Sequence, residues 1–298
     1  CLKSGNALIL KGGSEAKNSN RALFSLISKA AQENHIPKNA MQIIETREEV
    51  SRILKLHGYI DLIIARGSKG LVKYIQQNTK IPVLGHSGGI CHVFVDKDAN
   101  IKQAANICFD SKCQYPAACN SMETLLVHKG ITKTFLPLMA KKFFDAKVEI
   151  KGDRRAREII RHAKKAAEKD WSTEYNDMVV SVKVVDDLSE AIAHINKYGS
   201  RHTDAIVTER KKTAELFMGL VDSSSVIWNA STRFADGYRY GKCAEAGIST
   251  AKIHARGPVG LDGLVIYKYK LAGKGHIVID YVGKNAKKFK HRIIKQGT

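Results

Sequence analysis

Two hydrophobic periods alternate along this chain. Short apolar runs that are typical of strands are followed by segments whose apolar residues recur every three or four positions, as in an amphipathic helix. Strands are predicted at 5–11, 40–45, 60–64, 82–84, 92–96, 178–185, 205–208 and 226–228, and helices at 14–33, 46–56, 69–77, 99–112, 188–198 and 212–221. This alternation predicts an α/β fold whose parallel strands are joined by right-handed crossovers.

Two segments follow other patterns. Residues 131–170 are rich in lysine and are predicted to be helical. Residues 263–271 and 276–282 show partial period-two alternation, which predicts two strands joined by a turn at 272–275. An exposed edge strand of this kind invites pairing with another chain.

The chemistry is concentrated in residues 111–128, which read SKCQYPAACNSMETLLVH. Pro116 excludes a helix through the turn, and the apolar spacing that follows predicts a helix starting directly after Cys119. The free N–H groups and dipole of a helix start stabilise a thiolate, and they also bind an oxyanion formed at a carbonyl that the sulfur attacks. Cys119 is therefore a candidate nucleophile. The alternative is a small buried apolar residue, the usual state of a lone cysteine.

Two glycine-containing loops each follow a predicted strand and precede a predicted helix. They are residues 11–15 (KGGSE) and residues 66–70 (RGSKG). Glycine permits close backbone approach, and a helix start offers N–H donors to a phosphate, so both loops are candidates for binding a dinucleotide. The GxGxxG fingerprint is absent. The alternative is that each loop is an ordinary connection between a strand and a helix, without a ligand.

The composition favours anionic partners. The 298 residues carry 49 Lys+Arg against 29 Asp+Glu, a formal charge of +20. The basic residues are spread out, and no aromatic-rich motif accompanies them, so nucleic acid is not the favoured partner. No run approaches the ~20 apolar residues that span a bilayer, which predicts a soluble protein. Six cysteines without CxxC or zinc spacing indicate free thiols, no metal centre and a reducing compartment.

Four motifs in order resemble those of gamma-glutamyl phosphate reductases, members of the aldehyde dehydrogenase superfamily. They are GHSGGICHVFVDKDA, CQYPAACNSMETLLVH, STRFADGYRYG and HARGPVGLDGL. The chain is most similar to the reductase half of the delta-1-pyrroline-5-carboxylate synthases of animals and plants. The resemblance covers nearly the whole chain, with a weaker patch around 131–170. It departs at Ala65, where relatives usually have proline, and at Lys242 and Cys243.

The resemblance implies two parallel-sheet, Rossmann-like domains and a C-terminal oligomerisation hairpin. Residues 1–90 would be the C-terminal part of an NADPH-binding domain, 91–262 the catalytic domain, and 263–298 the oligomerisation strands with a basic tail. The family's reductase begins upstream of Cys1, and in the synthase a glutamate 5-kinase domain also lies upstream. The resemblance also implies a homo-oligomer. It implies a location in the mitochondrial matrix or the cytoplasm, and it favours the mitochondrial one.

The resemblance also implies roles for individual residues. Cys119 would form a thioester with the glutamyl group of gamma-glutamyl phosphate. The cofactor residues would be Lys11, Ser14 and Glu15 at the adenosine ribose, Gly67 and Ser68 at the pyrophosphate, and Glu174 at the nicotinamide ribose. Arg233 offers a planar fork for substrate anions. Asn120, Ser231 and Thr232 complete the predicted substrate site.

Two rival functions remain open from the sequence. One is an ordinary NAD-dependent aldehyde dehydrogenase, which needs a carboxylate that activates water against the thioester. Residues 85–94 contain no carboxylate, which favours the reductase; His86 and His92 are weaker acid–base candidates there. The other rival is an inactive protein of the same fold that binds anions or nucleic acid, in which case binding depends steeply on salt.

Overall fold

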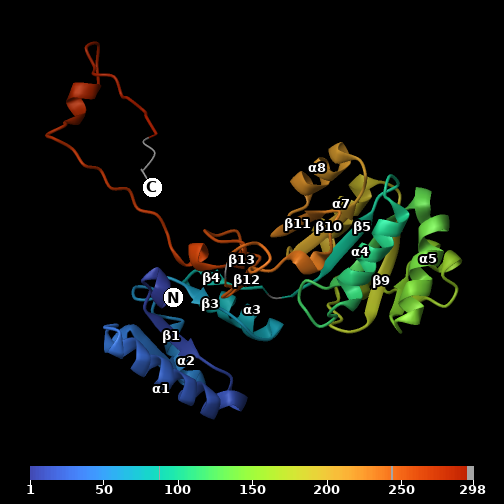
Figure 1. Ribbon diagram of the computed structural model, residues 1–298, viewed down its shortest axis with the longest axis horizontal. Helices are drawn as coiled ribbons and strands as arrows, with labels where there is room; N and C mark the ends of the chain where they lie inside the picture. The colour runs from blue at the N-terminus through green and yellow to red at the C-terminus, as the bar shows by residue number, and fades with distance from the viewer. Residues whose placement is uncertain (87, 243, 294–298) are drawn as a thin grey trace. The chain divides into compact units, whose positions relative to one another are not determined.

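The computed structural model describes residues 1–86, 88–242 and 244–293. The chain divides into two compact units, Cys1–Val265 and Ile266–Thr298. The first unit contains every strand that the described residues form, and strands alternate with helices through most of it (Figure 1). The α/β prediction is confirmed. The boundary between domains at residues 90 and 91 stays a prediction, because both parts fall in the first unit.

A seven-stranded sheet forms the core of the first unit. Its strands lie in the order β11-β10-β5-β6-β9-β7-β8, and every neighbouring pair is parallel. Their bounds are β5 Cys91–Val95, β6 Met122–His128, β7 Glu149–Gly152, β8 Lys164–Lys165, β9 Val179–Val185, β10 Thr203–Val207 and β11 Ser225–Trp228. The central strands are apolar on both faces, as expected for a parallel sheet covered on both sides.

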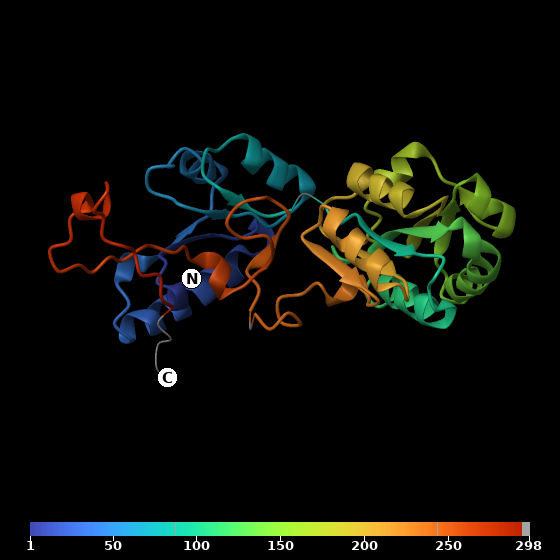
Figure 2. The ribbon, with the colours of Figure 1, turned by 90° about the horizontal axis from the view of Figure 1, so that it is seen from above.

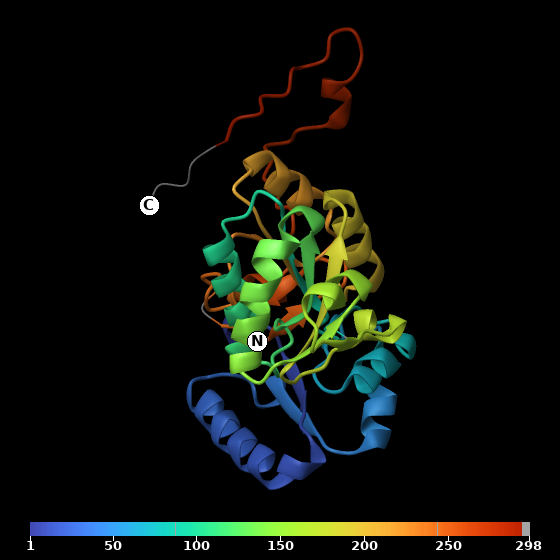
Figure 3. The same ribbon diagram turned by 90° about the vertical axis from the view of Figure 1, so that its right-hand side faces the viewer.

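Helices cover the two faces of this sheet (Figures 2 and 3). They are α4 Ile101–Cys113, α5 Thr132–Asp145, α6 Arg154–Ile159, α7 Leu188–Tyr198 and α8 Lys211–Leu220. Val93 and Val95 of β5 join the core cluster made with α4, α5 and α6, whereas Phe94 joins the cluster made with α7 and α8. Successive strand residues thus point to opposite faces, and both faces are buried.

The parts of the first unit outside this sheet contain smaller elements. The strands are β1 Leu8–Lys11, β2 Met41–Ile44, β3 Ile63–Ile64, β4 Val83–Leu84, β12 Gly247–Ser249 and β13 Gly257–Val259, and the helices are α1 Lys17–Glu33, α2 Arg47–Ile53 and α3 Lys69–Gln77. β1 pairs with β2 and β3 with β4, both in parallel, while β12 and β13 are antiparallel. The N-terminal strands therefore form two separate pairs, and both pairs are parallel as the sequence predicts.

Short 3₁₀ helices complete the chain. They are η1 Leu2–Ser4, η2 Ser14–Ala16, η3 Lys38–Ala40, η4 Lys129–Ile131, η5 Glu168–Ser172, η6 Thr232–Phe234, η7 Leu261–Leu264 and η8 Val278–Tyr281. Among the described residues, no helix combines the length and the apolar character needed to cross a membrane.

The helix predicted after Cys119 is wrong. Met122–His128 is β6, which pairs with β5 on one side and β9 on the other. Residues 122–127 are fully buried, so the run of apolar side chains serves a strand that is covered on both faces. A short apolar run does not distinguish such a strand from a helix, and here the tertiary position decides.

Two other predictions need correction. Residues 131–170 contain the helices α5 and α6 but also the strands β7 and β8, which the lysine-rich composition hides. The strands predicted at 263–271 and 276–282 are wrong in this structure, where those residues contain only η7, η8 and irregular chain. An isolated two-stranded hairpin is marginally stable, so a period-two pattern alone does not form one.

Candidate functional site

Cys119 lies in a tight turn between α4 and β6. The backbone N–H of Ser121 donates to the carbonyl of Ala118 at 2.8 Å, and that of Ala118 donates to the carbonyl of Tyr115 at 3.2 Å. The turn predicted around Pro116 is therefore present. It places the half-buried Cys119 at the amino end of β6, beside the segment that leads into β5.

The backbone of Gly89 presses directly against Cys119. A Cβ atom at position 89 would lie 2.0 Å from the carbonyl oxygen of Cys119 and 2.6 Å from its Cα, both impossible contacts. The same carbonyl accepts a hydrogen bond from the Cys91 thiol at 3.3 Å. Glycine at position 89 thus has a physical reason in this fold, because a side chain there would displace the cysteine.

A cavity of about 240 Å³ opens beside the sulfur. Its lining combines Cys119 with residues 65–67, which include the start of the second glycine loop, with Gly85 and His86, and with Glu245 and residues 247–248 of β12. The cysteine and the loop predicted to hold a pyrophosphate therefore share one cavity. Residues far apart in the sequence meet here, as expected of a ligand site.

The electrostatics around Cys119 differ from the prediction. Because β6 is a strand, Cys119 has no helix start behind it to stabilise a thiolate. Burial raises the pKa of Cys119, and the nearby carboxylates of Glu174 and Glu245 raise it further. The Arg233 guanidinium acts in the opposite direction and lowers the pKa of the thiol, but it does not outweigh the other groups. The resting state of this sulfur at neutral pH is the thiol.

Carboxylates reach the site from outside the segment 85–94. Glu174 accepts a hydrogen bond from the backbone N–H of Gly89 at 2.7 Å, which holds its carboxylate beside the cysteine turn. Glu245 lines the cavity and accepts from the N–H of Gly237 at 2.9 Å. Sequence reasoning missed Glu245, which no local motif marks. The lack of a carboxylate in 85–94 therefore does not mean that the site lacks one.

The predicted substrate residues surround the cysteine turn but are largely engaged. The Asn120 amide donates to the carbonyl of Ala235 at 2.9 Å, which ties the turn to the segment after η6. Ser231 and Thr232 are buried, with the Ser111 hydroxyl donating to Ser231 Oγ at 3.1 Å. Arg233 is half-buried and donates from Nε to Gln114 at 2.9 Å. Of the four, Arg233 is the one with charge to offer a substrate.

Buried oxygen atoms without partners add to this picture. Asn120 Oδ1 and Thr232 Oγ1 have no hydrogen-bond partner among the described residues. A buried polar atom without a partner is unfavourable, so each is a candidate contact for a bound ligand or water. That the substrate contacts these two atoms stays a prediction.

The predicted cofactor residues divide between two loops. Lys11 ends β1, and its Nζ donates to the carbonyl of Gly12 at 2.7 Å. Ser14 and Glu15 form the exposed start of η2. In the second loop, Ser68 caps α3 by accepting from the N–H of Leu71 at 3.3 Å. Gly67 has φ +146°, a conformation that favours glycine.

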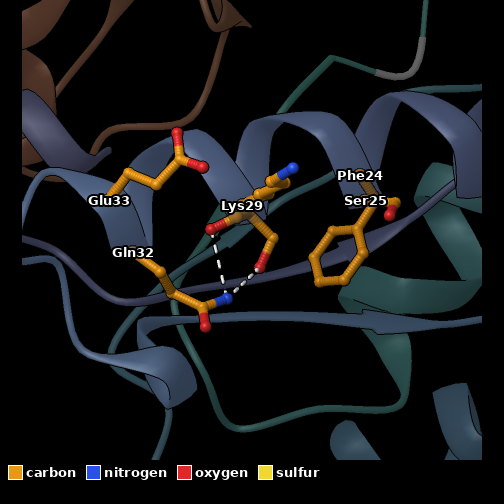
Figure 4. A pocket seen from close by; sticks show the side chains of 6 residues that line it. Phe24, Ser25, Lys29, Gln32 and Glu33 are labelled. Carbon is orange, nitrogen blue, oxygen red and sulfur yellow. Dashed lines mark hydrogen bonds between the residues drawn. The ribbon is translucent and has the colours of Figure 1, made fainter.

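These loops fit a nicotinamide dinucleotide in three respects. Both follow a strand of a parallel pair, the second precedes the capped N-terminus of α3, and Gly67 shares the cavity with Cys119. Strand ends and helix starts are where dinucleotide phosphates bind in α/β folds. By contrast, the depression lined by Phe24, Ser28 and Gln32 lies along α1 alone and contains none of the predicted site residues (Figure 4).

The histidines of 85–94 have different surroundings. His92 is fully buried in β5 with Nδ1 2.8 Å from Asp204 Oδ1, which makes it a structural residue. His86 is half-buried and lines the cavity that contains Cys119. The five described cysteines are free, as predicted, while Cys243 lies outside the described residues.

Comparison with known proteins identifies the fold and the family. Residues 1–167 match the aldehyde dehydrogenase family. A protein of Methanosarcina acetivorans named gamma-glutamyl phosphate reductase is 57% identical over 298 residues, which cover 98% of this chain and 67% of that protein. The crystal structure of gamma-glutamyl phosphate reductase from Thermotoga maritima has 43% identity and a TM-score of 0.90, and it covers 93% of this chain and 67% of that one.

The chain belongs to the gamma-glutamyl phosphate reductases, within the aldehyde dehydrogenase family. The resemblance drawn from the four motifs is confirmed. The chain spans about two thirds of the length of these family members. Both are prokaryotic proteins named as the reductase alone. They therefore give no support to a fused kinase domain, to the predicted similarity to the synthase, or to a mitochondrial location.

A more distant structure shows the breadth of the fold. Glyceraldehyde-3-phosphate dehydrogenase from Methanocaldococcus jannaschii, in complex with NADP, has a TM-score of 0.62 at 16% identity and covers 83% of this chain and 62% of that one. At that identity the likeness concerns the fold alone. The aldehyde dehydrogenase fold, with its parallel sheet, is confirmed.

Proposed function

We propose that this chain reduces gamma-glutamyl phosphate to glutamate 5-semialdehyde with release of phosphate, as a step in proline synthesis. The observation that carries the proposal is the position of Cys119, which shares a cavity with the Arg66–Gly67 loop in a chain 57% identical to a named gamma-glutamyl phosphate reductase. Glutamate 5-semialdehyde dehydrogenase activity is the same reaction in reverse. An acyl phosphate of this kind is supplied by a kinase acting on the side-chain carboxylate of glutamate.

The reaction requires Cys119 as a nucleophile. The deprotonated sulfur attacks the acyl carbon, the tetrahedral adduct expels phosphate, and a thioester remains on Cys119. A bound nicotinamide cofactor supplies the hydride that converts the thioester to a hemithioacetal. Collapse of the hemithioacetal releases the aldehyde and returns the thiolate.

The surrounding charges fit this sequence of steps. Arg233 lies close enough to Cys119 for its positive charge to lower the pKa of the thiol, and it suits the carboxylate or phosphate of the substrate. Glu174 and Glu245 keep the thiol protonated at rest, so a proton must leave before attack. Glu245, which lines the cavity, is our candidate for accepting it.

NADPH is the proposed cofactor. Lys11 and Ser14 lie at the end of β1 and the start of η2, where a cation and a hydroxyl suit the 2′-phosphate that distinguishes NADPH from NADH. Lys11→Glu should raise the KM for NADPH at least about tenfold and leave that for NADH nearly unchanged. Lys3→Glu, in η1, is the control for a general loss of positive charge.

The decisive assay runs the reaction in reverse. Glutamate 5-semialdehyde and NADP are supplied with and without inorganic phosphate, and NADPH formation is recorded. We expect formation that depends on phosphate, with loss of roughly 10³-fold or more in Cys119→Ser and near-normal rates in Cys113→Ser, a second free cysteine at the end of α4. Unchanged turnover in Cys119→Ser would reject the mechanism.

The same assay separates the rival functions. NADPH or NADH formation that ignores phosphate and yields glutamate indicates a hydrolytic aldehyde dehydrogenase, which the presence of Glu245 beside Cys119 keeps as the second candidate. A protein with no turnover whose binding to polyanions falls steeply with salt indicates the non-enzymatic alternative.

A further inference from the structure

Three potential metal ligands converge at the active cysteine. His86, Cys119 and His202 each offer one ligand atom, and these atoms all lie within 4.8 Å of one another. They come from three segments that precede different strands, β5, β6 and β10. No local motif in the sequence marks the group, because only the parallel sheet brings the three strand starts together.

The hydrogen bonds of the two imidazoles leave their Nε2 atoms available. His86 Nδ1 lies 3.1 Å from the carbonyl oxygen of Ile248, which only accepts, so Nδ1 carries the proton and Nε2 carries the lone pair. His202 Nδ1 lies 2.9 Å from the hydroxyl oxygen of Thr203. This arrangement, with one ring nitrogen held and the other free, is typical of histidines that bind metals.

His202 supplies an independent indication of a missing partner. Its side chain is fully buried, and its Nε2 has no hydrogen-bond partner among the described residues. Its ring meets the His86 ring edge to face, with centroids 4.9 Å apart. A buried ring nitrogen without a partner is unfavourable, and a bound cation would satisfy it.

The protonation states also suit a cation. Burial of the His202 side chain disfavours its charged form, and a neutral imidazole offers the lone pair that a metal needs. Glu174 and Glu245 place negative charge near Cys119 and would compensate the charge of the ion. Cys91, 3.9 Å from His202 Nδ1, is the other sulfur facing this ring.

We propose that His86, Cys119 and His202 form a three-ligand site for a zinc ion, which occupies the nucleophile and switches the enzyme off reversibly. Zinc favours nitrogen and thiolate ligands in a tetrahedron, whose edges measure roughly 3.3–3.8 Å for Zn–N near 2.1 Å and Zn–S near 2.3 Å. The three ligand atoms need approach by only about 1 Å to reach those edges. The Cys119 thiol loses its proton to solvent as the Zn–S bond forms, and the fourth position is left to water or an anion.

The inhibitory part of this inference rests on the proposed function, whereas metal binding does not. The full chain, freed of metal with a chelator, is therefore titrated with zinc alone, without substrate or cofactor. Isothermal titration gives stoichiometry and affinity, and cobalt as a probe reports a thiolate ligand by its charge-transfer absorption. We expect one tight site, release of a proton, a cobalt–thiolate band, and protection of Cys119 from iodoacetamide by zinc.

Matched variants identify the ligands. His202→Gln and His86→Gln should each weaken zinc binding at least about 100-fold and remove the protection of Cys119. His194→Gln is the control, because His194 is also buried with an unpartnered Nε2 but lies outside the cluster. Should the fully buried His202→Gln unfold, the half-buried His86→Gln carries the test.

The outcomes are distinct. Zinc binding that is unchanged in both histidine variants, or that leaves Cys119 open to alkylation, overturns the inference. A Cys119-dependent zinc site in a chain that shows no phosphate-dependent turnover supports the metal site and contradicts the proposed function. Normal turnover that zinc does not inhibit, in a chain that binds no zinc, contradicts the metal site alone.

Discussion

At the scale of single residues, the reactivity of Cys119 is set by neighbours that the sequence does not place beside it. Gly89 provides the space for its backbone, while Glu174 and Glu245 raise the pKa of its thiol. Arg233 is the group that acts in the other direction. These neighbours therefore favour the protonated form of the Cys119 thiol, which limits the side reactions of a thiolate.

The close contact at Gly89 gives a sharp test. Gly89→Ala places a Cβ 2.0 Å from the carbonyl oxygen of Cys119, so the cysteine turn must move. We expect a loss of turnover on the order of 100-fold, since small displacements of a nucleophile have effects of that size. Gly88→Ala is the matched control, because its Cβ meets only Glu174 Oε2, at 3.5 Å. Equal rates in the two variants would contradict this account of the contact.

The carboxylates near the sulfur predict the pH dependence of its alkylation. Because burial, Glu174 and Glu245 raise the pKa of Cys119 above 9.0, its reaction with iodoacetamide should be slow at neutral pH and still rise beyond pH 9. Glu245→Gln removes one negative charge, lowers the pKa and should accelerate alkylation at pH 7. Glu215→Gln, on the exposed side of α8, should react as the wild type does. The modified fraction is measured by mass spectrometry.

At the scale of elements, the cysteine turn is anchored by a buried ion pair between α4 and β6. Lys112 Nζ and Glu123 Oε2 lie 2.7 Å apart, and both side chains are fully buried. Glu123 Oε1 also accepts from the backbone N–H of Asn176, near Glu174. These contacts hold both ends of the turn that carries Cys119. Removing one partner would leave the other charge buried, at a cost of about 3–5 kcal/mol.

The ion pair predicts a pH-dependent stability. Burial raises the pKa of Glu123 from 4.5 to about 7, although Lys112 acts to lower it. The Glu123 carboxyl group therefore binds its proton more tightly in the folded protein than in the unfolded chain. The stability that this protonation contributes is lost as pH rises from about 4.5 to 7. The free energy of unfolding should fall by about 3 kcal/mol over this range.

Chemical denaturation of the wild type and of Glu123→Gln measures this contribution. The free energy of unfolding of the wild type relative to the variant should fall by about 3 kcal/mol between pH 4.5 and 7. Glu149→Gln, which removes an exposed partner of Lys164, should give a nearly constant difference over the same range. If the difference between the wild type and Glu123→Gln is also constant with pH, the Glu123 carboxyl group of the wild type has the same pKa in the folded and unfolded protein, and this prediction is wrong.

At the scale of the whole molecule, the chain combines a sheet-centred unit with a C-terminal unit of different character. No described residue of 266–293 is buried, and the apolar side chains there include Ile266, Tyr267 and Leu271. Alternating apolar residues that form no strand within the chain suit pairing with the sheet of a second copy. This supports the prediction of a homo-oligomer, in which 263–282 would gain its strands from a partner.

Truncation after Val265 tests that prediction. We expect light scattering to show a smaller particle with fewer copies than the full chain. The unfolding transition of the remaining unit should stay cooperative, because its core clusters lie within residues 1–265. Removing only 284–298 deletes the basic tail and should leave the number of copies unchanged. If both truncations keep the original particle size, the oligomer does not depend on this segment.

The sequence by itself determined the order of the helices and strands over residues 5–112 and 178–228. The helices predicted at 69–77 and 188–198 agree with α3 and α7, because period and capping residues act locally. The four motifs also determined the family, because each lies in contiguous residues, and they predicted Cys119 as the nucleophile. The strand β6 was missed because a fully buried strand and a buried helix share an apolar composition.

Only the tertiary structure decided the environment of Cys119. The fold brings Gly89, Glu174 and Glu245 to the sulfur, and Glu245 lies 126 residues after Cys119 in the sequence. It also brings His86 and His202 close to the same sulfur. A pKa depends on burial and on charges close in space, which local patterns do not encode. The sequence thus predicted which cysteine is the nucleophile, and the fold determines the protonation state of its thiol.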